Sequence, residues 1–282
     1  MTFVIFPFGL FLLIVWCLLQ QIWSSNYFSM KSIRNILCPT DFSENARNAF
    51  EYTLWFADQC GAAIQLLHVV YPQAEPLDFS SIALKSIEKK ESLARGLIKK
   101  FAAKSLEKMQ SFYTFKAEPS IEILVKTGTP TNQISGIAKE IKADLIIMGT
   151  KSIHNAFQKI FGSITSATTN HAHCPVLVVP EETKSFKISQ LVYTTNLRKI
   201  DLFQIWELGK QMRPFSPIFR IVHIAKKADK NVTKELSEIA HVWEADLLVM
   251  YKPHRNFLEE AFHISLTKMA TFHFKVPILV IK

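Results

Sequence analysis

Glycine and hydroxyl side chains gather in two short runs that are separated by nine residues in the middle of the chain. The first run is Gly149, Thr150, Lys151 and Ser152, and the second is Gly162, Ser163, Ile164 and Thr165, where an expected helix begins. Glycine lets the backbone come close to phosphate oxygens, and the unpaired N–H groups of a helix start stabilise their charge. The pattern predicts an anion cradle, although a glycine followed by serine also serves as an ordinary turn and helix cap.

One carboxylate, Asp41, directly follows an apolar run that ends in Pro39 and Thr40. At the end of a buried strand, such a carboxylate accepts hydrogen bonds from a ribose or from adenine. An aspartate in front of a helix also caps that helix, so both interpretations of Asp41 stay open.

The remaining reactive side chains form no recognisable catalytic or metal-binding pattern. His171, His173 and Cys174 lie close together but have no fourth ligand nearby in sequence. His68 and His223 recur at equivalent strand positions, as a catalytic pair could. Each copy has its own histidine, however, and the pocket of the second copy is expected to be closed, which favours packed or backbone-bonded histidines. The sequence also has no nucleophile elbow, no Walker loop and no paired carboxylates. We therefore expect no efficient enzyme and no metal site.

Five short apolar runs, rich in β-branched residues and bounded by turn residues, indicate strands buried on both faces. They span residues 32–39, 63–70, 121–128, 143–150 and 175–180, and amphipathic helices are expected at 43–60, 82–111, 130–142 and 163–173. Strands that alternate with helices predict an α/β fold with a doubly wound, Rossmann-like parallel sheet. Ligands of such sheets bind beyond the carboxyl ends of the strands, here in the loops after Cys38, His68 and Met148.

The chain repeats itself at two different offsets. Residues 36–41 and 67–69 align with 191–196 and 222–224 (196 − 41 = 155), whereas 143–148 and 175–179 align with 245–250 and 277–281 (245 − 143 = 102). The second copy has therefore lost 53 residues from its middle (155 − 102 = 53). Self-similarity of this kind indicates two tandem domains, of which the second is shortened.

These residues and strands together resemble the universal stress protein family. The resemblance rests on Pro39-Thr40-Asp41-Phe42-Ser43, Leu67-His68-Val69, Gly128-Thr129-Pro130 and the run from Ala143 to Gly149. It covers residues 31–180 well and 188–282 faintly. It implies a fold similar to that of the adenine nucleotide alpha hydrolases, and ATP or a related adenine nucleotide as the ligand of the first domain.

The resemblance also implies a role for each candidate site residue. Asp41 and Val69 would contact adenine and ribose, Pro39 and Thr40 would shape the pocket, Met148 and Gly149 would flank the nucleotide, and Gly162, Ser163, Ile164 and Thr165 would hold phosphates beside Lys151. Nucleotide-binding members have a G-x-x-G-x9-G-[S/T] loop, in which Ser152 here replaces the second glycine. If that position needs a positive φ, serine costs about 1 kcal/mol and weakens binding about tenfold.

The second copy lacks most of these residues. Asn196, Tyr251, His254 and Ile264 stand where the first copy has Asp41, Gly149, Ser152 and Gly162, and only Ser265 matches Ser163. Bulky side chains fill the space that a phosphate needs, so we expect the second domain to serve assembly. The resemblance further implies pairing of the last strands, residues 176–179 with 278–281, as a pseudo-dimer within one chain. A homodimer is a further option.

Charge, cysteines and the amino-terminal segment bear on partners and location. The formal net charge is +9, but the basic residues are spread along the expected helices, which argues against nucleic acid as a partner. Four cysteines without CxxC spacing favour a reducing compartment. Residues 2–30 carry no charged side chain, and residues 3–23 are interpreted either as a membrane anchor or as part of an upstream extension that is not translated.

Both interpretations place the body of the protein in the cytoplasm, tethered to the inner face of the membrane or free. The expected organisation is a hydrophobic segment at 1–29, an intact domain at 30–181 and a shortened domain at 187–282. The leading function is an ATP-binding module of the stress response. The alternatives are a slow ATPase that uses Lys151 and Ser163, and a scaffold that binds no nucleotide because of Ser152.

Overall fold

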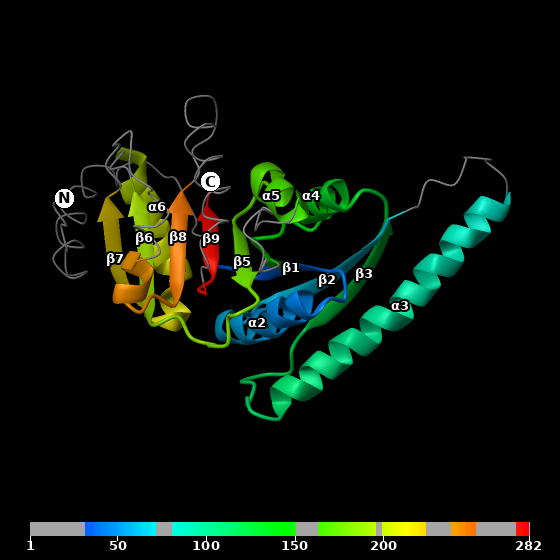
Figure 1. The fold of residues 1–282 in the computed structure, drawn as a ribbon, viewed down its shortest axis with the longest axis horizontal. Coiled ribbons are helices and arrows are strands. Elements are labelled where there is room, and N and C mark those ends of the chain that lie inside the picture. The colour runs from blue at the N-terminus through cyan, green and yellow to red at the C-terminus, as the bar shows by residue number, and fades with distance from the viewer. Residues whose placement is uncertain are drawn as a thin grey trace. The chain divides into compact units, whose positions relative to one another are not determined.

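The computed structural model describes residues 32–71, 81–150, 163–195, 199–223, 238–251 and 275–281, which fall into two compact units. Ile33–Phe186 form the first unit, and the described residues from Lys187 onward belong to the second. Strands within each unit pair in parallel (Figure 1).

The first unit alternates strands and helices along its length. Its elements are β1 (Asn35–Thr40), α2 (Glu44–Cys60), β2 (Ala63–Val70), α3 (Ser81–Gln110), β3 (Ile121–Thr127), α4 (Pro130–Glu140), β4 (Leu145–Thr150), α5 (Ser163–His171) and β5 (Val176–Pro180). The strand order is β3-β2-β1-β4-β5, and every pairing is parallel. The prediction of an α/β fold with a parallel sheet is therefore confirmed for this unit.

Helices cover both faces of this sheet (Figure 1). Leu37 of β1 packs in one apolar cluster with Ile134 and Ile137 of α4. The Sγ atom of the next residue, Cys38, lies 3.5 Å from the hydroxyl of Thr53 on α2. Because successive strand residues point to opposite faces, these contacts put α4 and α2 on opposite sides, and the central strands are apolar on both.

The strand β3 differs from its neighbours. Glu122 is exposed and Val125 is the only residue of β3 that is buried. The expectation that this run is buried on both faces is wrong, because β3 lies at the edge of the sheet and pairs on one side with β2.

Local signals explain where α2 and α4 begin and end. The Ser43 hydroxyl accepts a hydrogen bond from the N–H of Ala46 at 3.2 Å, and Gly61 ends α2 with a φ of 66°. Pro130 occupies the first turn of α4, after Gly128 with a φ of 144°. These are the cap and turn residues that the sequence indicated.

The second unit repeats this arrangement in shortened form. It contains β6 (Gln190–Thr195), α6 (Lys199–Gln211), the 3-10 helix η1 (Arg213–Phe215), β7 (Ile218–His223), β8 (Leu247–Tyr251) and β9 (Ile278–Ile281), with residues 238–242 also helical. The strand order is β9-β8-β6-β7.

Strand registers carry the two offsets of the sequence repeat. Asn35 pairs with Ala63 in the first unit, and Gln190 pairs with Ile218 in the second, both shifted by 155 residues (190 − 35 = 155). The β4 and β8 strands correspond at the shorter offset (247 − 145 = 102). The tandem duplication is therefore present in the backbone pairing itself.

No helix among the described residues combines the length and the apolar character needed to cross a bilayer. The segment 3–23, for which the sequence leaves a membrane anchor and an untranslated extension as alternatives, lies outside these residues.

Candidate functional site

The strand order reverses between β1 and β4, which makes this the switch point of the sheet. The β1–β2 ladder continues through Thr40 and His68, whereas the β1–β4 ladder has only the pairs Ile36–Leu145 and Leu37–Ile146. The two central strands therefore part toward their carboxyl ends. An open crevice at this point is where ligands of such sheets bind.

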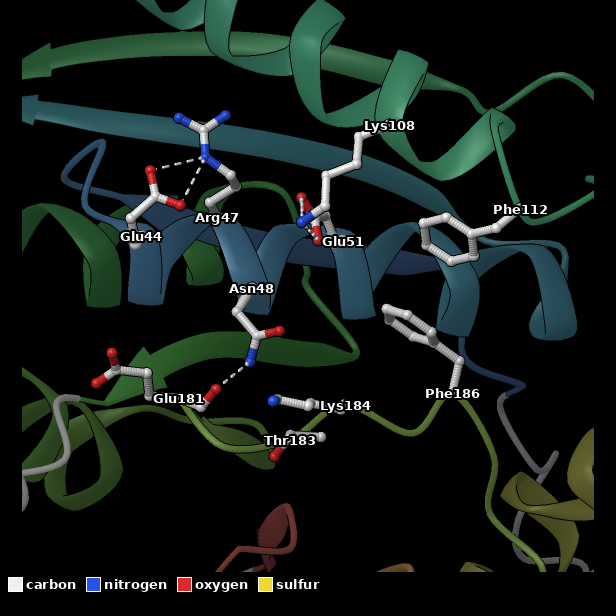
Figure 2. A pocket seen from close by; sticks show the side chains of 10 residues that line it. All are labelled: Glu44, Arg47, Asn48, Glu51, Lys108, Phe112, Glu181, Thr183, Lys184 and Phe186. Carbon is white, nitrogen blue, oxygen red and sulfur yellow. Dashed lines mark hydrogen bonds and ion pairs between the residues drawn. The ribbon is translucent and has the colours of Figure 1, made fainter.

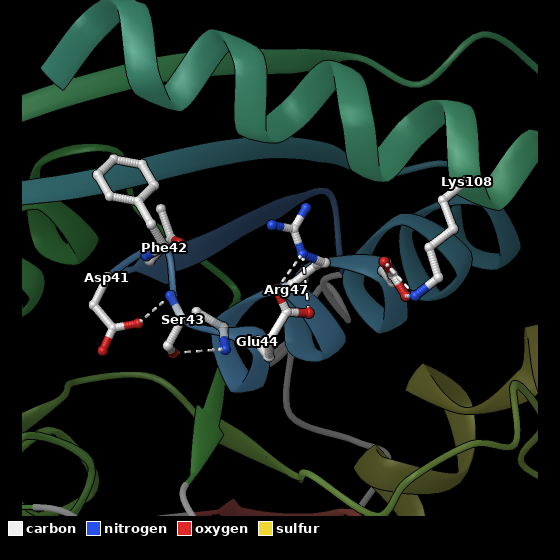
Figure 3. A network of polar contacts seen from close by, with 9 residues as sticks. Asp41, Phe42, Ser43, Glu44, Arg47 and Lys108 are labelled. Carbon is white, nitrogen blue, oxygen red and sulfur yellow. Dashed lines mark hydrogen bonds and ion pairs between the residues drawn. The ribbon is translucent and has the colours of Figure 1, made fainter. Parts of the chain in front are cut away.

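The loop after β1 folds back on itself through three short-range hydrogen bonds (Figure 3). Asp41 Oδ1 accepts from the N–H of Ser43 at 3.0 Å, and Thr40 Oγ1 accepts from the N–H of Phe42 at 3.1 Å. Ser43 itself caps α2. The open question about Asp41 is answered in part: it forms an Asx-turn, and its exposed second oxygen has no hydrogen-bond partner among the described residues.

Phe42 adopts a φ of 66°, which is uncommon for a residue with a bulky side chain. Its ring stacks on His68, with centroids 4.3 Å apart, and meets Phe101 edge-on at 5.7 Å. His68 Nδ1 lies 2.9 Å from the Thr40 carbonyl oxygen. Because a carbonyl only accepts, Nδ1 carries the proton, and His68 is the packed, backbone-bonded histidine that the sequence favoured.

Gly149 meets the first turn of α2 at close range. A Cβ atom on this residue would lie 2.5 Å from the carbonyl oxygen of Asn45. On the other side, Thr165 Oγ1 of α5 lies 3.4 Å from the carbonyl oxygen of Gly149. Packing of helix against strand therefore requires glycine here. The approach of a phosphate to Gly149, which the sequence suggested, stays a prediction.

The predicted site residues that the structure describes divide into three groups by exposure. Asp41, Ser163 and Ile164 are exposed; Pro39, Val69 and Gly149 are partly buried; Thr40, Met148 and Thr165 are buried. Lys151, Ser152 and Gly162 lie outside the described residues. The structure thus brings Asp41, Gly149 and the start of α5 to the carboxyl edge of β1 and β4, and the contact of Thr165 with Gly149 joins two of the predicted runs.

A second concave surface lies along α2, away from the residues that the sequence selected (Figure 2). It has a volume of about 380 Å³ and is lined by α2, the end of α3 and residues 181–186. Asn48 Nδ2 donates to the Pro180 carbonyl oxygen at 2.9 Å, which ties α2 to the chain after β5. A contact across 132 residues leaves no local signal in the sequence.

The charges in this groove are mostly paired with one another. Lys108 Nζ lies 2.9 and 2.8 Å from the two carboxylate oxygens of Glu51, whose side chain is only 4% exposed. Arg47 Nε lies 3.2 Å from Glu44 (Figure 3). The Glu51–Lys108 pair holds α2 against α3, whereas the Glu44–Arg47 pair lies within α2, so the groove has primarily a structural role.

No group of three metal-ligating side chains occurs within the part of the chain that the structure describes. His171 Nδ1 lies 2.9 Å from the Ala167 carbonyl oxygen of its own helix. Cys38 and Cys174 are buried and, like Cys60, form no disulfide. Burial raises the pKa of the Cys38 thiol to about 12, so this side chain is an inert core residue.

The second unit carries tyrosine where the first has Gly149. Tyr251 pairs with Ile281 in β9, as Gly149 pairs with Val179 in β5, so the aligned positions coincide in register. Its side chain is partly buried. Asn196, His254, Ile264 and Ser265 lie outside the described residues.

The strand order and the parting of β1 from β4 define an α/β fold of the nucleotide-binding type. The universal stress protein family model matches residues 32–180, more than half of the chain. The chain belongs to the universal stress protein family. A universal stress protein of Methanocaldococcus jannaschii is 29% identical over 153 residues, which cover 54% of this chain and 84% of that protein.

Two solved structures match nearly the whole chain. A universal stress protein from Archaeoglobus fulgidus has a TM-score of 0.66 at 16% identity and covers 89% of this chain and 97% of its own. A functionally unknown protein from Pseudomonas aeruginosa has a TM-score of 0.55 at 13% identity, with coverages of 90% and 94%. At these identities the likeness shows the fold, a tandem of two universal stress protein units.

Proposed function

We propose that the first unit binds ATP or a related adenine nucleotide at the switch point, and that the protein acts as a binding module of the stress response. The observation that carries this proposal is the convergence of Asp41, Gly149 and the start of α5 on the edge where β1 and β4 separate. Membership of the family supports the ligand class.

Each side chain has a chemical role in this proposal. The unpaired oxygen of Asp41 accepts a hydrogen bond from the ribose or adenine, while its partner oxygen keeps the loop in place. The exposed first residues of α5, Ser163 and Ile164, offer backbone N–H groups and a hydroxyl to phosphate oxygens. Lys151, which precedes this helix in the sequence, supplies positive charge for the same phosphates in this proposal.

Efficient hydrolysis is not part of the proposal. Asp41 Oδ1 and His68 Nδ1 hold the loop after β1 together, and the sequence shows no nucleophile elbow and no paired carboxylates that would accompany them in an efficient hydrolase. Phosphate release above the buffer rate in a steady-state assay with ATP would instead support the slow ATPase. We also propose a cytoplasmic location, for which the free thiols favour a reducing compartment. The pseudo-dimer within the chain and a homodimer are proposals about assembly.

Titration calorimetry with ATP tests the binding proposal on the full chain. Ser163→Glu puts a negative charge at the exposed start of α5 and should weaken ATP binding at least about tenfold through repulsion of the phosphates. Ser92→Glu makes the same change at an exposed position of α3 and should bind like the wild type. Absence of heat with the wild-type protein would favour the interaction scaffold.

A further inference from the structure

The helix α3 carries a large share of the chain's positive charge. It contains eight lysine and arginine residues and three glutamates, a net charge of +5 (8 − 3), in a chain whose total is +9. Ile98, Ser105 and Met109 are completely buried against the rest of the first unit. Among the described side chains, Lys89, Lys90, Arg95, Lys99, Lys100 and Lys104 are exposed on the outer surface of the helix.

Six outer residues of α3 share one face of the helix, because they are spaced by three, four or seven positions. They are Lys89, Lys90, Leu93, Leu97, Lys100 and Lys104, and we call this surface the Lys–Leu face. Leu93 is 61% exposed and Leu97 is 55% exposed. None of the six side chains has a hydrogen bond or ion pair within the described part of the chain.

Of the three glutamates of α3, Glu107 is exposed and continues the same side of the helix three positions past Lys104. Glu91 accepts a hydrogen bond from Thr127 Oγ1 of β3 at 2.7 Å, which turns it toward the sheet. Lys108, one turn past the face, is occupied by Glu51. Between Lys89 and Lys104 the Lys–Leu face therefore combines four lysines, with no glutamate among them, with two solvent-exposed leucines.

We infer that the Lys–Leu face docks on an anionic membrane surface. Exposed leucines enter the boundary between headgroups and acyl chains, while flanking lysines lie against the lipid phosphates. A nucleic acid satisfies the lysines but offers no apolar partner to Leu93 and Leu97. A second copy of the chain covers the leucines but brings four further lysines against the four already there.

The part of the second unit that the structure describes has no counterpart of this face. Only residues 224–237 separate β7 from the helical residues 238–242, too few for a counterpart of the 30-residue α3. Docking through α3 can be distinguished from insertion of the amino-terminal segment by its dependence on anionic lipid. That segment has no charged side chain between residues 2 and 30, so its insertion does not depend on anionic lipid.

Flotation of the full chain with vesicles tests the inference. Vesicles of phosphatidylcholine with one third phosphatidylglycerol should bind the protein at least about tenfold more tightly than pure phosphatidylcholine, and high salt should remove the difference. Lys100→Glu with Lys104→Glu should abolish the preference. Leu93→Gln with Leu97→Gln, which keeps good helix formers, should reduce binding to the anionic vesicles several-fold.

A matched control uses the same helix. Arg95 and Lys99 are exposed but lie on the side opposite to the Lys–Leu face, so Arg95→Glu with Lys99→Glu should lower binding by much less than the Lys100 and Lys104 pair. Equal losses from the two pairs would indicate non-specific attraction. That result, or unchanged binding of the leucine variant, would overturn the inference.

A local probe keeps the test decisive if the amino-terminal segment binds every vesicle. Gly96 lies between Leu93 and Lys100 on the helix, and nothing surrounds the position of a Cβ there. An environment-sensitive dye on Gly96→Cys, with Cys17 and Cys60 changed to serine, should shift to the blue with anionic vesicles only. No shift with either vesicle, or a shift on adding RNA in their absence, would reject lipid docking.

Discussion

Asp144 and Asp246 make the same contact in the two units. Asp144 Oδ2 accepts from the backbone N–H groups of Arg34 and Asn35 at 2.9 and 3.0 Å. Asp246 Oδ2 accepts from Ser189 and Gln190 at 2.8 and 3.0 Å. Each carboxylate fastens the start of the unit's first strand to the strand that pairs with it. The contact survived the loss of 53 residues because it lies outside the deleted region.

The first prediction concerns these two carboxylates. Asp144→Ala removes two charge-assisted hydrogen bonds and should lower the free energy of unfolding of the first unit by about 2 kcal/mol. Asp246→Ala should cost at least as much, because this side chain is 8% exposed and also lies 3.3 Å from Lys187 Nζ. Urea denaturation measures both, and Glu140→Ala, at an exposed position, should change little. Equal stability of Asp144→Ala and wild type would contradict the structural role.

The second prediction concerns Gly149 and Asn45. Gly149→Ala places a methyl group 2.5 Å from a backbone oxygen, so α2 must shift, and stability should fall by about 1–3 kcal/mol. The control is Gly136→Ala in α4, where nothing lies within 4 Å of the new Cβ, and which should gain about 0.5–1 kcal/mol. Thermal unfolding of the two variants should therefore shift in opposite directions. A gain from both would show that the approach of Asn45 is not required.

Much of the fold could be predicted from the sequence, because strands buried on both faces of a parallel sheet have short apolar sequences that are easily recognised. The strands, the four helices of the first unit and the repeat offsets agree with the expected ones to within a few residues. The aligned pair Asp144 and Asp246 was also visible as an aspartate common to both copies. The hydrogen bonds that these aspartates accept could not be predicted, because their donors are backbone N–H groups, which leave no signal in the sequence. The edge position of β3 was missed because an apolar run does not reveal its neighbours.

The site was predictable at the level of strand ends but not of side-chain geometry. The position of Asp41 and Gly149 at neighbouring strand ends follows from the parallel order. The positive φ of Phe42 and its stacking on His68 had no signal, because a bulky aromatic residue is not expected in that conformation. The approach of Asn45 to Gly149 likewise depends on how α2 crosses the sheet.

The third prediction concerns alkaline pH. Burial raises the pKa of Cys38 and of Cys60 from 9.0 to about 12. Desolvation and the neighbouring Asp58 raise the pKa of Tyr113 from 10.0 to about 12. In the unfolded chain these groups ionise at lower pH than in the folded one. Stability is therefore retained below about pH 9 and should fall as the pH rises from 9 toward 12.

Urea midpoints at pH 7.5, 9 and 10.5 measure this effect. Cys60→Ser, at a partly buried position, should flatten the decline above pH 9, because a serine hydroxyl does not ionise there. Ser111→Ala, at an exposed position near Tyr113, serves as the control and should keep the wild-type slope. A wild-type midpoint that stays constant up to pH 10.5 would show that these groups ionise equally in both states.

The last prediction concerns Ser152, which stands where nucleotide-binding members of the family have the second glycine of their loop. If the family's backbone conformation is needed to hold phosphates, serine opposes it, and Ser152→Gly should strengthen ATP binding about tenfold. The change removes a side chain from the proposed phosphate path as well. Calorimetry on the full chain measures the gain, with Ser92→Gly as a control for the added flexibility of a glycine.

The double variant Ser152→Gly with Ser163→Glu makes this prediction specific to the proposed site. Negative charge at the start of α5 should cancel the gain if both residues face the same phosphates, because their effects then act on one ligand. A gain that persists in the double variant would place the nucleotide away from α5. No gain from Ser152→Gly in an otherwise ATP-binding protein would show that the loop tolerates serine. The departure from the family pattern at Ser152 would then carry no cost for binding.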